Sequence, residues 1–246
     1  MKNRKIWVML VGLFTALTSG FMGTTLTFAE ENEASQTIEQ PSYISDFPNQ
    51  VGHWQDLVGT AEKKNDSAGL WIANTKQGTN LESVSINLDA REQSSGDLEL
   101  TFLYEGQSNF GLVFRGDKQK TSQWQSFAYN RDGRWQLGQP GGKWLTNIPG
   151  PTLLSGQQYK LLVRYDGKKI QTFLNDQLFY ENEEVHYPDG TSINDDWTGA
   201  VGIRLFGNLS KLNIISMKSG SVGSIPVIDS SAEYRELKEK WRNQLV

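Results

Sequence analysis

Residues 159–181 read YKLLVRYDGKKIQTFLNDQLFYE, and this stretch determines the expected fold class. From 159 to 165 and from 170 to 174, aromatic, aliphatic or β-branched residues occupy every second position. This period of two indicates β-strands with one buried face. Asp166-Gly167 and Asn175-Asp176 lie between the expected strands, and such pairs tolerate the positive φ angles of tight hairpin turns. The stretch therefore predicts consecutive antiparallel strands.

The same pattern extends over most of the chain. Apolar and aromatic residues recur at every second position from Leu98 to Tyr104, and Asp132-Gly133 marks another hairpin turn. No amphipathic helix interrupts the region 43–219, which has room for about ten or more short strands. The sequence thus predicts an all-β fold, a two-sheet antiparallel sandwich of the jelly-roll type.

Composition excludes several classes of function. The chain has 246 residues, of which 37% are hydrophobic and 21% are charged, as in soluble globular proteins. Its net charge of −4 is unfavourable for general binding to nucleic acid. Cysteine is absent, and His53 and His186 are the two histidines. Disulfides, cysteine nucleophiles and multi-histidine metal sites are therefore excluded.

The N-terminal residues are expected to direct export. Three cations within the first five residues precede an apolar run from Ile6 to Leu17, and Thr27-Phe28-Ala29 supplies a small-x-small cleavage site. We interpret residues 1–29 as a secretory signal peptide, because the apolar run is short for a membrane span; an uncleaved anchor is the alternative. Cleavage removes three cations and no anions, which lowers the net charge from −4 to −7. The mature chain is then expected outside a bacterial cell and free of the membrane.

The C-terminal residues follow a different period. Ser230 and Glu233 form a capping box for a helix. Apolar residues then recur at helical spacing at Tyr234, Leu237, Trp241 and Leu245. We expect polar linkers at 30–42 and 220–229 and an amphipathic helix at 230–246. Because an apolar helix face must be buried, this helix either folds back on the sandwich or opens a helical domain that is missing from this chain.

The region 109–219 resembles concanavalin A-like and laminin-G-like sandwiches. It contains, in order, GLVFRGD (111–117), FAYNRDGRWQLG, the stretch 159–181, GAVGIRLFG and KLNIISMKS. Such sandwiches share a glycine-hydrophobic-x-Phe-Arg strand, a paired hairpin with Asp-Gly and Leu-Asn-Asp-Gln, and a closing Gly-x-Val-Gly-Ile-Arg strand. The resemblance implies the fold and leaves the ligand open, since this fold includes lectins, hydrolases and structural modules.

The tail EYRELKEKWRNQL, residues 233–245, resembles the opening helix of family 8 polysaccharide lyases of Gram-positive bacteria, the hyaluronate lyase group. In that group a β-sandwich often lies between the signal peptide and an α/α toroid that carries the catalytic Asn, His and Tyr. The resemblance implies that this chain is an N-terminal module, truncated before the toroid. It places no lyase catalytic residue in this chain.

Known catalytic motifs do not occur in the sequence. It lacks the Glu-x-Asp-x-x-Glu run of laminarinase-type hydrolases, as well as GxSxG and HExxH. We therefore expect no catalytic residue and no enzymatic activity in this chain. A glycan hydrolase of the same fold, using loop carboxylates that no motif identifies, is the alternative.

The segment DGTSINDD, residues 189–196, is rich in oxygen ligands and could bind calcium. Its candidate ligands are Asp189, Asn194, Asp195 and Asp196. The segment lacks EF-hand spacing, and Asp and Asn are common in turns, so an ordinary loop is the competing interpretation. We expect no other cofactor.

A basic and aromatic segment at 115–144 is the main candidate for ligand binding. It contains six cations and two anions in a chain whose net charge is negative. Sugar rings present C–H faces to aromatic side chains, and the carboxylate of an acidic sugar accepts two hydrogen bonds from a guanidinium. The predicted ligand contacts are Arg115, Trp124, Arg131, Arg134, Trp135, Trp144 and Trp197.

Packing competes with binding as the role of these residues. Tryptophan is highly buried on average, so Trp135, Trp144 and Trp197 could each belong to the core. Arg115 could instead pair with a carboxylate on a sheet face. Trp54 and Trp71 are expected in the core.

These patterns together predict a secreted, non-catalytic, monomeric carbohydrate-binding module that targets a polysaccharide lyase to an acidic glycan. The choice of hyaluronan or a related glycosaminoglycan depends on the lyase resemblance and on the basic segment. Neither nucleic acid nor a membrane is an expected partner. A structural or adhesive spacer, which needs no exposed tryptophan, is a further alternative.

Overall fold

The computed structural model describes residues 42–44, 51–67, 69–74 and 81–228, together with Tyr234, Glu236 and Lys240. The chain divides into two units, 1–37 and 38–246, and every described residue belongs to the second. The predicted signal peptide and nearly all of the predicted linker 30–42 lie outside the described residues. Within the described part, no helix is both long enough and apolar enough to cross a bilayer.

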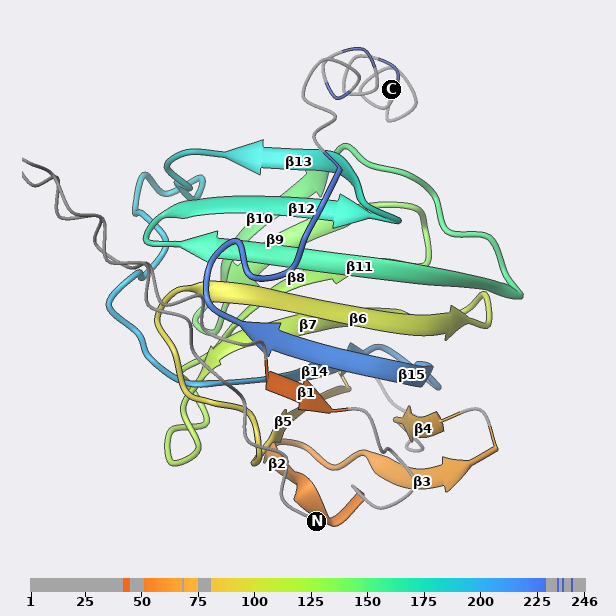
Figure 1. Cartoon of the computed structure of the whole chain (residues 1–246). Coiled ribbons are helices and arrows are strands. Elements are labelled where there is room, and N and C mark those ends of the chain that lie inside the picture. Colours follow the sequence, from red (N-terminus) through yellow and green to blue (C-terminus); the bar gives the residue numbers. More distant parts are fainter. Residues whose placement is uncertain are drawn as a thin grey trace, which may run out of the picture. The chain divides into compact units, whose positions relative to one another are not determined.

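The described chain forms two antiparallel sheets, which Figure 1 shows as two layers. In the eight-stranded sheet, β1 (Ser42–Ile44) pairs with β15. The remaining strands lie in the order β13 (Gln177–Asn182), β12 (Lys169–Leu174), β11 (Gln157–Asp166), β6 (Gly96–Tyr104), β15 (Lys211–Gly220), β4 (Gly69–Ala73) and β3 (Glu62–Asp66).

The second layer is a seven-stranded sheet, which lies behind the first in Figure 1. A short 3₁₀ helix, Val51–His53, precedes its edge strand β2. The strands lie in the order β10 (Lys143–Ile148), β9 (Trp135–Gln139), β8 (Gln125–Tyr129), β7 (Asn109–Gly116), β14 (Ala200–Phe206), β5 (Glu82–Asn87) and β2 (Trp54–Val58). The arrangement is the predicted all-β sandwich of the jelly-roll type.

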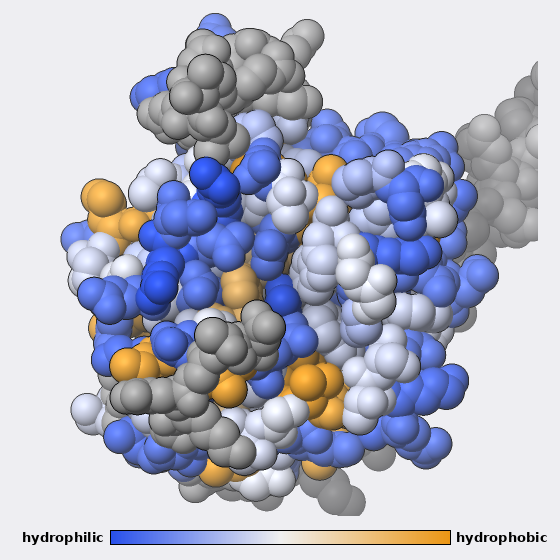
Figure 2. Space-filling view, turned by 180° about the vertical axis from the view of Figure 1, so that it is seen from behind, coloured by the Kyte–Doolittle hydropathy of each residue, from blue (hydrophilic) through white to orange (hydrophobic). Residues whose placement is uncertain are grey.

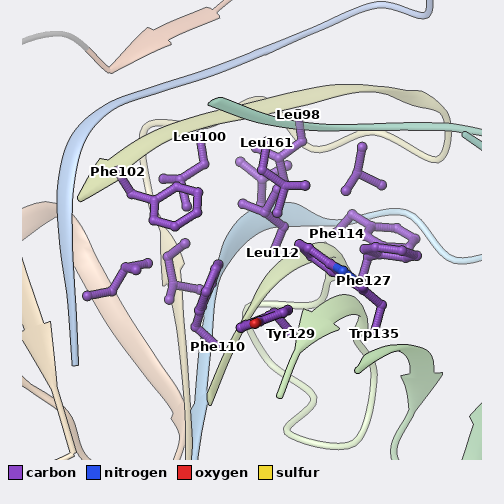
Figure 3. Packing of buried hydrophobic residues seen from close by; sticks show 14 of the residues in the cluster. Leu98, Leu100, Phe102, Phe110, Leu112, Phe114, Phe127, Tyr129, Trp135 and Leu161 are labelled. Atoms are coloured by element: carbon purple, nitrogen blue, oxygen red, sulfur yellow. The ribbon is translucent and has the colours of Figure 1, made fainter. Parts of the chain in front are cut away.

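The core lies between the two sheets, where the alternating residues meet. Leu98, Leu100 and Phe102 of β6 are fully buried, as is Leu161 of β11. Figure 3 shows them pointing toward side chains of the other sheet. The labelled partners from that sheet are Phe110, Leu112, Phe114, Phe127, Tyr129 and Trp135. Period-two alternation was therefore a correct guide to the buried face.

The predicted hairpin turns are also confirmed by backbone angles. Gly133 has a φ of 89° and Gly167 a φ of 54°. Asn175 and Asp176 adopt φ values of 50° and 68°. A two-residue hairpin needs this left-handed conformation, which asparagine, aspartate and glycine adopt at low cost.

The end of the chain is described at three positions. Tyr234, Glu236 and Lys240 have helical backbone conformation. The other residues of the helix predicted at 230–246 lie outside the described part of the chain.

A buried arginine ties three connections together at one end of the sandwich. Arg115 is 0% exposed, and its backbone φ of 56° interrupts the regular alternation near the end of β7. Its Nε donates to the carbonyl of Ser94 at 2.7 Å, and its Nη2 donates to that of Gly167 at 2.7 Å. Its Nη1 donates to the carbonyl of Asn194 at 3.2 Å and to Oε1 of Gln125 at 2.9 Å.

These acceptors are neutral, so Arg115 is a buried cation solvated by carbonyl dipoles. Its Cζ lies 5.3 Å from the ring centroid of Tyr165 and 5.9 Å from that of Phe114, which adds cation–π attraction. Burial lowers the pKa of Arg115 from its usual value, because a charge away from water is disfavoured. The guanidinium replaces water as the partner of three loop carbonyls, and this fixes the loops to one another.

We predict that Arg115→Met destabilises the sandwich by at least about 3 kcal/mol. Methionine has a similar length but leaves the three carbonyls without a donor, and each orphaned buried acceptor costs roughly 1–3 kcal/mol. Urea unfolding followed by tryptophan fluorescence measures the change. Arg131→Met is the matched control, because Arg131 is exposed. Equal stabilities of the two variants would contradict this role for Arg115.

We also predict that the sandwich loses stability between pH 10 and 12. Burial raises the pKa of both Tyr104 and Tyr180 from 10.0 to about 12, because their phenolate forms are poorly solvated. A raised pKa means that the stabilising contribution is complete below pH 10 and is lost as the pH rises toward 12. Alkaline titration should show tyrosinate absorbance rising together with loss of the near-ultraviolet circular dichroism. Ionisation of all tyrosines near pH 10 with the fold intact would contradict the prediction.

Candidate functional site

Trp135 is not a ligand contact in this structure, and this corrects the sequence prediction. Its side chain is 0% exposed and points into the core, where its ring lies 4.8 Å from that of Phe179 and 5.6 Å from that of Phe127 (Figure 3). Its indole N–H donates to the carbonyl of Pro151 at 3.0 Å. The residue follows a hairpin turn, but it is the first residue of β9 and the pleat directs it inward.

Trp124 and Trp144, two other predicted contacts, do come together on the outer face of the seven-stranded sheet. Their ring centroids are 6.2 Å apart. Trp144 lies across Gly138 of the neighbouring strand, where a Cβ atom would come within 2.1 Å of the indole ring. Trp124 is 1% exposed and donates its indole N–H to the carbonyl of Thr121, whereas Trp144 is half-buried. Trp144 is therefore the ring that a ligand can reach.

These two rings cover a second apolar cluster, separate from the core between the sheets. Its buried members are Leu57, Val84, Ile86, Val113, Trp124 and Ala200. Figure 2 shows this side of the molecule, where groups of apolar residues interrupt a largely hydrophilic surface. An outer sheet face of this kind is more apolar than solvent contact requires, which is typical of a binding surface.

Arg204 is the cation of this face, and the sequence analysis missed it. It projects from β14 between two rings, with its Cζ 4.2 Å from the centroids of both Trp144 and Phe206. Its Nε bonds to Oε1 of Glu82 at 2.5 Å. Its Nη1 is buried and has no hydrogen-bond partner among the described residues. Arg204 is 7% exposed, and burial lowers the pKa of its guanidinium while Glu82 opposes that shift.

A hollow of about 360 Å³ opens beside this arginine. It is lined by Leu81, Glu82, Arg204, Phe206 and Gly207, and we call it the Arg204 hollow. It offers a carboxylate, a guanidinium with unmet bonding capacity and the exposed part of an aromatic ring. A hydroxylated ring that carries an acidic group matches each of these features.

Arg131 and Arg134 lie at the same end of the seven-stranded sheet as this hollow. The backbone N–H of Arg131 donates to the side-chain carbonyl of Asn109, whose amide donates to the carbonyl of Phe206 at 3.0 Å. Both arginines are exposed, and Arg134 forms a loose ion pair with Asp132 at 3.8 Å. They supply positive charge near the hollow without being built into it.

The remaining predicted contacts lie away from the hollow. Arg115 is the buried structural residue described above, so its prediction as a ligand contact is wrong: its donors are already bonded to protein carbonyls. It does not pair with a carboxylate on a sheet face either. Trp197 is half-buried in the connection between β13 and β14, at the Arg115 end of the sandwich. Trp54 is buried as expected, but Trp71 is half-buried under the ammonium of Lys64, 4.2 Å from the ring centroid.

The oxygen-rich segment 189–196 uses several of its oxygens within the protein. The carbonyl of Asn194 accepts from Arg115 and, at 2.5 Å, from the side-chain amide of Gln125. Asp189 accepts from the backbone and hydroxyl of Thr191, and this bonding lowers its pKa. Among the described residues, no group of three or more Asp, Glu or His side chains is arranged to bind a metal ion.

The signal for Arg204 was present in the sequence GAVGIRLFG. Val201, Ile203 and Leu205 alternate into the core, so the residues between them must face outward. The position of a charged residue in that outward row is unusual because its neighbours there are glycine and phenylalanine. The segment 115–144 drew attention instead because its charges are close together along the chain.

The fold and its outer face define a class: a jelly-roll sandwich with an arginine held between aromatic rings on one sheet. No family model matches the chain. A Bacillus subtilis protein of unknown function with a galectin-like fold has a TM-score of 0.54 and 13% identity, over 74% of this chain and 98% of that one. A GlcNAcα1-4Gal-releasing endo-β-galactosidase from Clostridium perfringens has a TM-score of 0.51 and 10% identity, over 76% and 64%. At these identities the similarity concerns the fold alone.

The sequence itself is far closer to one particular protein. Over all 246 residues, the chain is 99% identical to a segment of hyaluronate lyase HylB from Enterococcus faecalis. The chain spans 24% of that protein's length. The resemblance to the hyaluronate lyase group seen in the tail therefore extends over the whole chain.

We predict that Trp135→Ala and Trp144→Ala differ sharply in their effect on stability. Removing the fully buried Trp135 leaves a cavity in the core, which costs about 3–5 kcal/mol. Trp144 is half-buried on the outer face, so its removal costs less and leaves the fold intact. Chemical unfolding of the two variants measures the difference. The same substitution is made in both, so a larger loss for Trp144→Ala would contradict this assignment of the two faces.

Proposed function

We propose that the chain is a non-catalytic carbohydrate-binding module, and that it binds an acidic polysaccharide such as hyaluronan along the outer face of the seven-stranded sheet. The observation that carries this proposal is the state of Arg204. Its guanidinium is nearly excluded from water, lies between two aromatic rings and has an unpaired Nη1. A buried charged donor without a partner is costly, and an anion that bonds to it recovers that cost.

The arrangement suggests how a uronic acid would be held. Glu82 fixes the Nε edge of Arg204, which leaves the Nη groups as donors for the carboxylate of the sugar. The C–H face of a sugar ring would pack on the exposed parts of Trp144 or Phe206. Arg131 and Arg134 would attract further carboxylates of the polymer from solution, an effect that salt weakens.

A role without catalysis is supported by the composition of the hollow. Glycoside hydrolysis uses a pair of carboxyl groups on either side of the scissile bond. Of the residues that line the Arg204 hollow, Glu82 alone carries a carboxyl group, and it is bonded to Arg204. This favours binding over the alternative of a glycan hydrolase.

The similarity to a segment of a hyaluronate lyase supports the choice of ligand and the targeting role. A module that binds the polymer would hold an attached lyase close to its substrate and raise the effective substrate concentration. Export through the signal peptide predicted at 1–29 belongs to the same proposal, since the polymer is extracellular. The proposal includes a monomeric module and needs no calcium.

Binding of hyaluronan oligosaccharides, measured by isothermal titration calorimetry, tests the role of Arg204. Arg204→Gln is expected to weaken binding by roughly tenfold to a hundredfold, because a charge-assisted hydrogen bond is worth about 1.5–3 kcal/mol. Lys168→Gln is the matched control: it removes an equal charge at an exposed position of the other sheet, where Lys168 pairs with Glu184. This control should bind like the unaltered chain, and thermal unfolding should show that both variants are folded.

Carboxyl-reduced hyaluronan and added salt separate the acidic-glycan proposal from its alternatives. We expect the neutral polymer to bind weakly and added salt to weaken binding of the native polymer. Equal binding of both polymers would retain a carbohydrate-binding module but reject the role of the carboxylate. No binding of any polysaccharide would favour a spacer, and release of shortened or unsaturated products would favour an enzyme.

A further inference from the structure

The segment after β15 returns across the outer face of the eight-stranded sheet. In Figure 1 it leaves β15, crosses in front of β11 and β12 and continues toward β13. Ile225 of this segment is 4% exposed, although it lies on the solvent side of the sheet. Its backbone N–H donates to Oδ2 of Asp97 at 3.0 Å, and its carbonyl accepts from Nη2 of Arg164 at 2.9 Å.

Asp97 and Arg164 form the ion pair that holds Ile225. Asp97 on β6 is 0% exposed and lies opposite Arg164 on β11. Nε of Arg164 bonds to Oδ1 of Asp97 at 2.7 Å and Nη2 bonds to Oδ2 at 2.8 Å, a two-point contact. This bonding raises the pKa of Arg164 above its usual value. A buried pair is stable only when its remaining donors and acceptors are also satisfied, and the backbone of Ile225 supplies that contact.

An apolar row on the same sheet face supports the segment further. Leu162 on β11 is paired with Phe173 on β12, which is paired in turn with Leu178 on β13. Regular alternation would expose all three side chains, but each is buried. Ile225 and Tyr234 join them in one apolar cluster, with Val227 packed against it. The row is therefore occupied by a later part of the same chain.

Tyr234 provides a second anchor, nine positions beyond Ile225. It is 7% exposed, and its hydroxyl accepts a hydrogen bond from the backbone N–H of Glu181 at 3.1 Å. Burial raises the pKa of Tyr234. Glu236 and Lys240, which follow it, have helical backbone and exposed side chains.

We propose that Ile225 and Tyr234 form a two-point clamp that fixes the helical C-terminal segment to the outer face of the eight-stranded sheet. The occupant of the row of Leu162, Phe173 and Leu178 is the chain's own segment from Ile225 to Tyr234. The sandwich would then be a rigidly oriented attachment, and the residues around Glu236 and Lys240 would keep a defined direction relative to the seven-stranded sheet. A freely jointed linker, as expected at 220–229, would give no such orientation.

Distance measurements between two spin labels test the clamp directly. The chain has no cysteine, so cysteines introduced by Gln157→Cys and Glu236→Cys are labelled without background. Both positions are exposed. We expect double electron–electron resonance to give one narrow distance distribution in the otherwise unaltered chain. The additional pair Ile225→Ser and Tyr234→Ala should at least double the width of that distribution.

Two controls keep this experiment decisive. Ile228→Ala alters the same segment at a residue that is 68% exposed, and it should leave the distribution narrow. Tyr234→Ala alone lies outside the core between the sheets, so it tests the second anchor even if Ile225→Ser reduces stability; circular dichroism verifies that the sandwich is folded. A broad distribution in the unaltered chain, or an unchanged narrow one in folded variants, would overturn the proposal. Neither result depends on glycan binding.

Discussion

The guanidinium of Arg115 is the constraint on which one whole end of the sandwich depends. It donates to carbonyls in the connection before β6, in the β11–β12 turn and in the connection before β14. A carboxylate would satisfy one arginine at one point, whereas neutral carbonyls from separate connections allow a single cation to organise all three. The left-handed backbone at this residue has a cost, which these contacts offset.

The two sheets share one core but use their outer faces differently. On the seven-stranded sheet, Gly138 leaves room for Trp144 to lie flat, and Arg204 reaches the same ring from β14. On the eight-stranded sheet, an apolar row and the Asp97–Arg164 pair are covered by the segment that follows β15. The covered face is closed to a long polymer, and this leaves the seven-stranded sheet as the binding surface. Binding and attachment thus occupy opposite sides of the sandwich.

The candidate site was predictable in kind and only partly in its residues. Aromatic rings with an arginine were the correct expectation for an acidic sugar, and Trp124 and Trp144 do meet. The arginine beside them is Arg204, about sixty positions further along the chain than Trp144. Antiparallel pairing brought β14 next to β7, so closeness along the sequence was a poor guide to closeness in space.

The sequence by itself determined the strands, the hairpin turns and the buried face, because period two and turn chemistry are local properties of the chain. It also indicated the hyaluronate lyase group through the tail, and the whole-chain match agrees with this. Tertiary structure alone decided which charged and aromatic residues were buried. Trp135, Arg115 and Arg204 have similar polarity patterns around them, yet one belongs to the core, one bonds to loop carbonyls and one faces a hollow. Burial depends on which strands become neighbours and on where a backbone irregularity turns a side chain, and both are properties of contacts between residues far apart in the sequence.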